Sequence, residues 1–218
     1  MEESRFGING FWLKLIAVIT MLIDHTGSVL FPQYIELRYI GRIAFPIYCF
    51  LIVEGAMHTS DIKKYQLRLL LFAFISEIPF DLAHGGAAFD FQSQNVFFTL
   101  FLGLFAVSAI ERYKRSFKSS AIVVLICLLS ILLKTDYSVG GVCFILFFYI
   151  FYKNKIAQCI SFALTNALVF GGIQNYALFS LIPIYLYNGK RGINVKYLFY
   201  IFYPAHLMIL YIIKYYIL

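Results

Sequence analysis

Charged residues are scarce in this chain of 218 residues. Asp, Glu, Lys and Arg make up only 13% of it, whereas 61% of the residues are hydrophobic and the mean hydropathy is +0.81. So little charge excludes an ordinary soluble domain, in which about one quarter of the residues are charged. The aromatic share of 19% also exceeds what a soluble core accommodates, while helix faces against lipid accept such residues. The sequence therefore predicts an integral membrane protein.

Common motifs of soluble enzymes are missing as well. The chain has no Walker phosphate loop, no GxGxxG motif and no GxSxG motif, and no internal repeat is evident. The four cysteines form no CxxC pair and no Cys/His cluster, so we interpret them as small buried hydrophobes and expect no metal site. They are Cys49, Cys127, Cys143 and Cys159. No small-residue cleavage pattern ends the first apolar run, which we expect to be retained as a helix.

Long apolar runs fill almost the whole sequence. A membrane span needs about 20 apolar residues, and this rule predicts nine transmembrane helices joined by short connections. We therefore expect an all-α polytopic bundle that forms a single transmembrane domain over residues 1–218. The approximate limits of the nine spans are 11–31, 38–57, 66–84, 95–111, 119–134, 138–152, 156–171, 174–188 and 197–217.

The net charge of +7 comes from short clusters between the apolar runs and not from a basic tail. We interpret it as membrane topology and expect no nucleic-acid partner. A cytoplasmic amino terminus puts most of the 18 Lys and Arg residues on the inner side. The exceptions are Arg38, Arg42, Lys134 and Lys214. An odd number of spans then places the carboxyl terminus outside.

Asp24 and His25 are adjacent inside the first apolar run. A charged side chain at the centre of a span costs about 2.5–3.5 kcal/mol, so such a pair marks a functional site by default. In one interpretation Asp24 orients His25 and raises its basicity, which suits a general base. In the other, Asp24 pairs with Arg42 in a structural lock between the first two helices.

Arg42, Glu77, His206 and Tyr203 are further candidates within the spans. Arg42 can neutralise an oxyanion or hold an anionic group, and Glu77 can relay protons. Tyr203 and His206 are three residues apart on the last span, so they share a helix face. Two imidazoles at comparable depth make a cavity shared by His25 and His206 plausible.

Two histidines and an arginine receive less weight. His58 and His84 fall at the ends of expected spans, and we assign them no role. For Arg38 we favour a side chain that simply extends its charged group to the outer membrane interface.

Pro46, four residues after Arg42, is expected to free a backbone carbonyl and bend the second span.

Taken together, several segments along the chain resemble the TraX family, membrane proteins named for acetylating the pilin of F-type conjugative pili. They include MLIDHTG at 21–27, YIGRIAFP at 39–46, SEIPF at 76–80, NVFFT at 95–99, YNGKRG at 187–192 and YIFYPAHL at 200–207. The resemblance runs through almost the entire chain. It implies a multi-pass protein of the bacterial inner membrane that uses acetyl-CoA to acetylate the amino terminus of a pilin-like or other exported peptide.

In such an enzyme, His25 oriented by Asp24 would remove the proton of the acceptor. Arg42 would stabilise the oxyanion or hold the donor, and His206 would act as a second base. Cytoplasmic cations are candidates for binding the phosphates of CoA, although topology alone also accounts for each of them. They are Lys63, Lys64, Arg68, Lys190, Arg191 and Lys196.

Two alternatives to peptide acetylation stay open at the sequence level. The same machinery could acetylate a hydroxyl of a cell-surface glycan. A proton-coupled transporter or export accessory is the other alternative, with Asp24, His25, Glu77 and His206 as a proton relay. The lack of an inverted repeat counts against a transporter, because many transporters have one.

Overall fold

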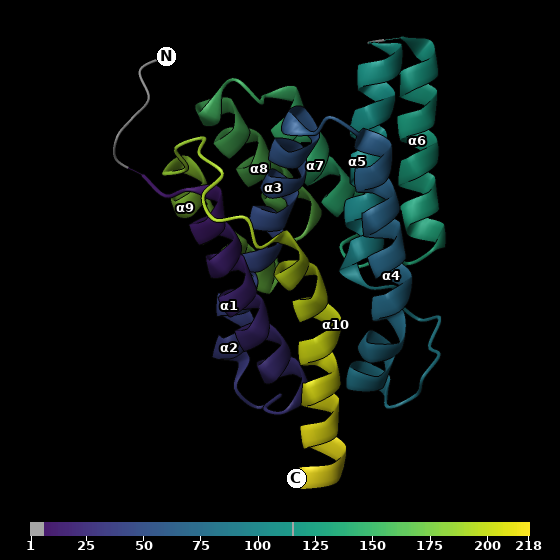
Figure 1. The fold of residues 1–218 in the computed structure, drawn as a ribbon, viewed down its shortest axis with the longest axis vertical. Helices are drawn as coiled ribbons and strands as arrows, with labels where there is room; N and C mark the ends of the chain where they lie inside the picture. The colour runs from purple at the N-terminus through teal and green to yellow at the C-terminus, as the bar shows by residue number, and fades with distance from the viewer. Residues whose placement is uncertain (1–6, 115) are drawn as a thin grey trace.

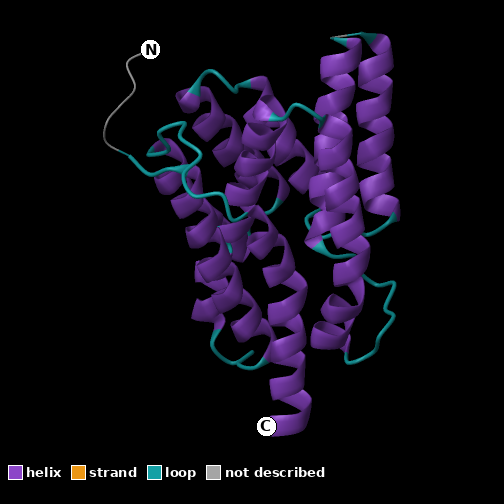
Figure 2. Ribbon diagram, in the orientation of Figure 1, coloured by secondary structure: helices purple, strands orange, loops and turns teal. Residues whose placement is uncertain are grey.

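A computed structural model describes residues 7–114 and 116–218, without the side chain of Lys196. Helices joined by short loops make up this part of the chain, which contains no strand and only two isolated bridges, Ile8 to Tyr187 and Gln94 to Thr135 (Figure 2). The predicted all-α class is confirmed.

The helices follow one another along the chain in an elongated bundle (Figure 1). In order they are α1 Gly10–Val29, α2 Ile35–Gly41, α3 Ala44–His58, α4 Ile62–Gly85, α5 Val96–Tyr113, α6 Phe117–Leu132, α7 Ser138–Ile150, α8 Lys155–Val169, the 3-10 helix η1 Gly172–Ser180, α9 Leu181–Tyr185, α10 Lys196–Ile212 and the π-helix η2 Ile213–Ile217. Helix α3 is central and packs against α1, α5 and α7, while α10 packs against α1 and α4.

Polar side chains fix where several helices begin. Asn9, Asp61, Asn95, Ser116 and Asn154 each accept a hydrogen bond from a backbone N–H in the first turn of the helix that follows. These N–H groups have no partner within the helix, and a side-chain cap contributes about 1 kcal/mol. The sequence thus marks the starts of α1, α4, α5, α6 and α8.

The second expected span, 38–57, is divided into α2 and α3. Pro46 has no N–H to donate to the carbonyl of Arg42 four residues earlier, so a continuous helix is interrupted there. The break falls at Arg42 and Ile43, and Pro46 lies in the first turn of α3, where an N–H is not needed. Arg42 and Ile43 keep helical backbone angles, so α2 and α3 still form one segment, Ile35–His58, with a two-residue turn where the bend was expected.

Helix α2 lies very close to α1. A Cβ added to Gly41 would collide with the side chain of Asp24, and one added to Gly27 would lie 2.7 Å from the Cβ of Leu37. Small residues permit such approach between membrane helices. The glycines therefore bring the arginines at the end of α2 within reach of α1.

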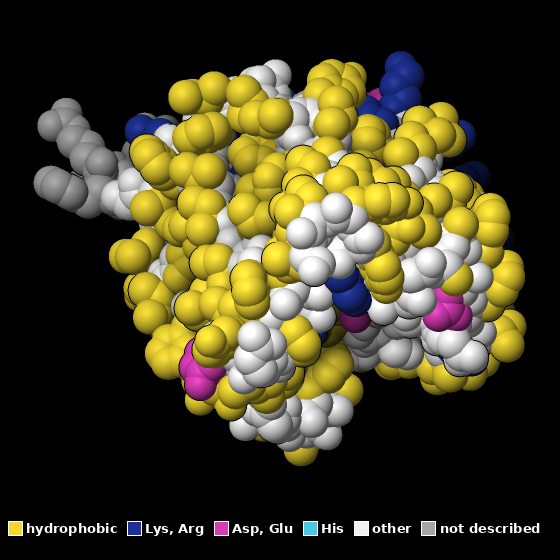
Figure 3. All heavy atoms as spheres, turned by 90° about the horizontal axis from the view of Figure 1, so that it is seen from below, with side chains coloured by type: hydrophobic (Ala, Val, Ile, Leu, Met, Phe, Trp, Pro, Cys, Tyr) yellow, Lys and Arg dark blue, Asp and Glu magenta, His cyan; other side chains and the backbone are white. Residues whose placement is uncertain are grey.

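Four described segments are long and apolar enough to cross a membrane. They are Gly10–Val29, Ile35–His58, Val96–Tyr113 and Tyr197–Ile217. Helices α6, α7 and α8 are apolar but shorter, and the expected span 174–188 is a 3-10 helix followed by the short α9. Hydrophobic side chains dominate the surface seen from below (Figure 3). The chain is thus a helical membrane protein, and the count of nine spans and the orientation stay predictions.

Candidate functional site

Two imidazoles meet between α1 and α10. The Nδ1 of His25 lies 2.6 Å from the Nε2 of His206, and the rings are stacked with centroids 4.9 Å apart and planes 12° from parallel. The ring of Tyr203 lies edge-on to both, at 5.9 Å from His25 and 5.7 Å from His206. The structure therefore brings together the three residues that the sequence suggested would share one region.

The hydrogen bonds of His206 determine which nitrogen of His25 is unprotonated. The Nδ1 of His206 lies 2.7 Å from the carbonyl of Phe202, which can only accept, so this nitrogen carries the hydrogen. In a neutral imidazole the other nitrogen then accepts, and the Nδ1–H of His25 donates to it. The Nε2 of His25 keeps a lone pair, as a general base requires.

A third imidazole completes the group. His84 lies at the end of α4 with its ring edge-on to that of His25, 5.8 Å between centroids, and its Nδ1 lies 3.0 Å from the carbonyl of Phe80. Unlike His206, His84 is exposed. Sequence reasoning set it aside as a residue at a span end, because its proximity to His25 arises only from the packing of α4 and α10 around α1.

Asp24 is bound by two arginines. One carboxylate oxygen lies 2.6 Å from Nη1 of Arg38 and the other 2.6 Å from Nη2 of Arg42, with the carboxylate buried. Within the described residues Asp24 makes no hydrogen bond to His25, which points elsewhere because neighbouring helix residues diverge by about 100°. The partner of His25 is thus His206 and not Asp24 as expected. The Asp24–Arg42 pair is the structural lock that was the alternative interpretation, and Arg38 joins it instead of extending to the interface as expected; Asp24, Arg38 and Arg42 are here called the lock.

The lock reaches the loop that precedes α7. Arg42 donates through Nη1 to the hydroxyl of Tyr137 at 3.1 Å, and the Tyr137 ring stacks on Phe45 with centroids 3.7 Å apart. Burial raises the pKa of the neighbouring Asp136 to about 6, and the positive charge of Arg42 opposes this shift. Arg42 therefore connects α1, the α2–α3 break and α7.

Glu77 joins α4 to the start of α5. Its Oε2 accepts from the side-chain amide of Asn95 and from the Asn95 backbone N–H at 3.3 Å. The same amide donates to the carbonyl of Ala73 at 2.8 Å, and the Asn95 carbonyl oxygen caps α5. Through Oε2, Glu77 thus holds two helices together, while its Oε1 is buried without a hydrogen-bond partner among the described residues.

A cavity of about 480 Å³ leads from one end of the bundle toward the imidazoles. It follows α1 from Gly10 to Met21, roughly 16 Å at about 1.5 Å per residue. Met21 and Tyr203 line its inner end, and each precedes a histidine, His25 or His206, by about one helical turn. The cavity therefore ends about one turn from the imidazole pair.

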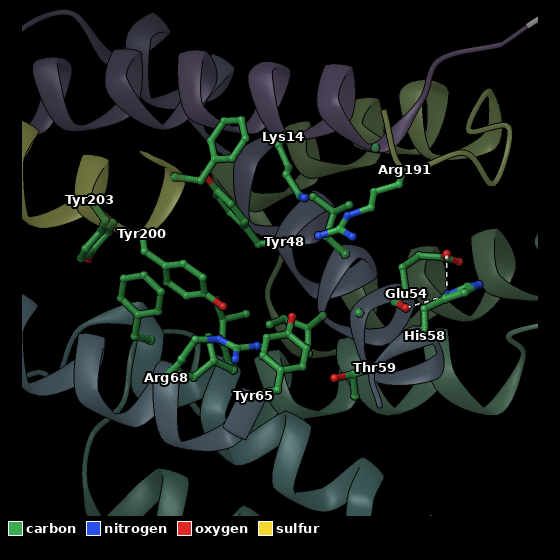
Figure 4. Close-up of a pocket in the computed structure, with 18 of the residues that line it drawn as sticks. Lys14, Tyr48, Glu54, His58, Thr59, Tyr65, Arg68, Arg191, Tyr200 and Tyr203 are labelled. Atoms are coloured by element: carbon green, nitrogen blue, oxygen red, sulfur yellow. Dashed lines mark hydrogen bonds and ion pairs between the residues drawn. The ribbon is translucent and has the colours of Figure 1, made fainter. Parts of the chain in front are cut away.

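Aromatic and cationic side chains form much of the cavity wall. Lys14, Arg68 and Arg191 lie around its space, from α1, α4 and the loop before α10 (Figure 4). The hydroxyl of Tyr48 and the Nε of Arg68 are buried without a hydrogen-bond partner in the described structure. Tyr65 lies under the Arg68 guanidinium at 5.5 Å. These groups leave polar atoms available for a ligand.

Five of the six predicted donor-binding cations have described side chains, and they divide into two groups. Arg68 and Arg191 line the cavity, whereas Lys63 and Lys64 are exposed outside it. Lys190 is also outside the lining, and its carbonyl accepts from the N–H of Gly10 at 2.8 Å. The side chain of Lys196 lies outside the described residues. Sequence reasoning missed Lys14 and Tyr48, and the only signal for them was a lysine inside the first apolar run.

The fold and site define a helical membrane protein with an imidazole pair beside a cation-lined cavity. The chain belongs to the TraX protein family, whose profile matches residues 10–214. It is 30% identical over 237 residues to the probable fimbrial assembly protein FimC, serogroup H1, of Dichelobacter nodosus, covering 95% of this chain and 96% of that protein. The uncharacterized protein RP591 of Rickettsia prowazekii (strain Madrid E) is 33% identical over 91 residues, 42% of this chain and 33% of that protein. No solved structure matches.

Proposed function

We propose that the protein is a membrane-embedded acetyltransferase that moves acetyl from cytosolic acetyl-CoA to the N-terminal amine of a pilin-like or other exported peptide. The observation that carries this proposal is the cation-lined cavity that ends about one helical turn from His25 and His206. The family membership and the relative named as a probable fimbrial assembly protein support an acceptor related to pili.

The donor would enter from the end of the cavity where the cations gather. Lys14, Arg68 and Arg191 are suited to the phosphates of CoA, because guanidinium and ammonium groups bind phosphate oxygens strongly. A volume of about 480 Å³ suits the acetylated pantetheine arm between the tyrosines, with the nucleotide at the mouth. The thioester carbonyl would then lie toward Met21 and Tyr203.

In the transfer step, the acceptor nitrogen attacks the thioester carbon and Nε2 of His25 takes the proton from that nitrogen. The carbonyl oxygen becomes an oxyanion as the new C–N bond forms. When the C–S bond breaks, the sulfur leaves with the electron pair and takes the proton, giving the amide and the CoA thiol. His206 would hold His25 in the required tautomer through the 2.6 Å hydrogen bond.

The oxyanion needs a hydrogen-bond donor. Tyr48 is a better candidate than Arg42 because its unpartnered hydroxyl lies on the cavity wall. Both terminal nitrogens of Arg42 are already bound, one to Asp24 and one to Tyr137. We therefore assign Arg42 and Asp24 to holding the helices and not to the reacting atoms.

The acceptor would approach from the opposite end, past the exposed His84. This arrangement requires a multi-pass protein of the bacterial inner membrane with its amino terminus in the cytoplasm. Single cysteines at residues 87–93 should react with a membrane-impermeant maleimide in intact cells, while cysteines at residues 112–118 should not. The reverse labelling pattern would place the cation-lined mouth on the outer side.

The deciding experiment uses the full chain purified in detergent with radiolabelled acetyl-CoA. A peptide with a free N-terminal amine should become labelled, and the same peptide with a blocked amine should not. His25→Ala protein matched for folded yield should give no label above background. Transfer only to a glycan hydroxyl would mean that the acceptor is a glycan and not a peptide. If no acceptor were labelled and no CoA were released, the proposal that the protein is an acetyltransferase would be rejected.

The three imidazoles also suit a second function, proton-coupled transport. His206, His25 and His84 extend from a buried position to the surface, as a proton relay would. Proteoliposomes with an entrapped pH dye distinguish the two functions. A transporter would acidify or alkalinise the lumen without acetyl-CoA, whereas the acetyltransferase would leave the dye signal unchanged.

A further inference from the structure

A second cavity, separate from the first, lies between α5, α6 and α7. Its volume is about 1000 Å³, at the upper end of the roughly 300–1,000 Å³ typical of small-molecule sites. None of its lining residues belongs to the lining of the cation-lined cavity. It is therefore available for a ligand other than the acetyl donor.

The wall of this second cavity changes from apolar to polar along all three helices. On α5 and the residue after it the lining runs from Ile110 to Lys114, and on α6 it runs in the opposite sense, from Ser119 to Val124. On α7 and just beyond, it runs from Leu146 to Lys153. The polar ends lie together because the α5–α6 connection and the end of α7 are at the same end of the bundle (Figure 1).

This gradient matches a molecule with an apolar body and a charged head at a membrane boundary. Val124 and Ile150 are 59% and 46% exposed, so the apolar part opens to the side of the bundle, where lipid chains would contact it. The head would lie where Lys114 and Lys153 meet the aqueous boundary. A phospholipid has this combination of parts.

The charges favour an anionic head group. Neither the Lys114 nor the Lys153 ammonium group forms a hydrogen bond or ion pair with another described residue. The carboxylate of Glu111 also lines the cavity, and its Oε1 accepts from the hydroxyl of Tyr149 at 2.7 Å. Two lysines against one glutamate leave a net positive charge, and basic pockets between membrane helices bind acidic lipid head groups.

We propose that this cavity binds one anionic glycerophospholipid, with the phosphate between Lys114 and Lys153 and an acyl chain along Val123, Val124 and Ile150. Such a site would fix the α5–α6 hairpin against α7 in the membrane. The inference does not depend on the acetyltransferase proposal, because lipid binding is measured without donor or acceptor.

Native mass spectrometry of the full-length protein in detergent tests the site, with phosphatidylglycerol as the probe. The Lys114→Ala/Lys153→Ala variant should bind it about 30-fold more weakly, since each lysine near an acidic lipid contributes a factor of about five. The Lys63→Ala/Lys64→Ala variant is the matched control, because it loses the same charge outside both cavities and should bind normally.

Two further measurements distinguish a lipid site from a site for a free anion. Val124→Trp, which fills the apolar part and keeps both lysines, should also weaken phosphatidylglycerol binding. Equal binding of phosphatidylcholine, or an equal loss in the control variant, would overturn the proposal. If millimolar inorganic phosphate displaced the lipid and the Val124→Trp variant bound phosphatidylglycerol as well as the wild type, the cavity would be a free-phosphate site. That result would also overturn the proposal.

Discussion

His25 and His206 share a hydrogen bond of 2.6 Å although 181 positions separate them in the chain. The bond joins the first described helix to the last long one, and its direction is set by the carbonyl of Phe202 on the far side of His206. This pairing gives each imidazole a different task in the proposed reaction, and mutations can separate the two.

His25→Ala should lower kcat for acetyl transfer by about 10²- to 10⁴-fold, the usual contribution of a general base. His206→Ala should lower it less, because the base is present but no longer held in one tautomer. His206→Gln should recover part of the loss, since an amide oxygen can accept from the Nδ1–H of His25. Turnover is measured at saturating donor with variants matched for folded yield, and a His206→Ala enzyme as active as the wild type would contradict the tautomer argument.

Asp24→Asn and Arg42→Gln should act mainly on stability. Removing one partner of a buried ion pair costs about 3–5 kcal/mol, and the remaining contact with Arg38 should reduce that loss for Arg42→Gln. In a double-mutant cycle measured by thermal unfolding in detergent, the two changes should be strongly non-additive. Additive losses would show that the two residues do not act as one unit.

Removal of a cation from the cavity wall should weaken donor binding. Arg68→Ala, Arg191→Ala or Lys14→Ala should raise the apparent KM for acetyl-CoA with a smaller effect on kcat, and added salt should mimic this effect by screening. Lys63→Ala should change neither constant because its side chain is exposed outside the cavity. If Lys63→Ala raised KM as much as Arg68→Ala, the cavity would not be where the phosphates bind.

Gly41→Ala should destabilise the protein by about 1–3 kcal/mol, the usual cost of overpacking. The added methyl group would collide with Asp24 and push α2 away from α1. Gly85→Ala is the matched control, because a Cβ there meets only Asp90 at 3.4 Å. Thermal unfolding of the two variants decides the point, and equal midpoints would mean that the α1–α2 contact tolerates a shift.

Asp136→Asn should flatten the pH dependence of stability between about pH 4 and pH 6. Burial raises the pKa of this carboxyl to about 6 in the folded protein, above the ordinary value of about 3.9. Its ionisation therefore opposes folding, and the stability it contributes at low pH is lost as the pH rises through this interval. The unfolding midpoints of wild type and variant should differ least at pH 4. A difference that is largest at pH 4 would contradict the raised pKa.

Composition and long apolar runs predicted the all-α membrane class, because backbone groups in lipid must be hydrogen-bonded within the protein and few folds other than helices achieve this. The limits of the apolar runs also lie within a few residues of the starts of most helices, and the caps Asn9, Asn95 and Asn154 fix three of those starts in the structure. The turn at Arg42 and Ile43 and the 3-10 helix at 172–180 were harder to predict. In both places the backbone departs from a continuous α-helix within a run that is apolar throughout.

The residues of the site and the proximity of His25 to His206 were predictable, but the choice of partner for Asp24 was not. Asp24, His25 and His206 stand out because each is costly inside a membrane. Which of them touch depends on how α1, α2 and α10 pack, and a sequence neighbour such as Asp24 lies on a different face from His25. His84, Tyr48 and Lys14 gain their importance only from the space around them.

The lock has a consequence for the biosynthesis of the chain. Asp24 finds Arg38 and Arg42 only 14 and 18 residues later, so its charge is neutralised as soon as the second helical segment follows the first into the membrane. The imidazole pair forms only when the last long helix has been made. A ribosome that stops before α10 would therefore release a chain with α1 and α2 correctly paired in the bilayer and with the partner of His25 missing.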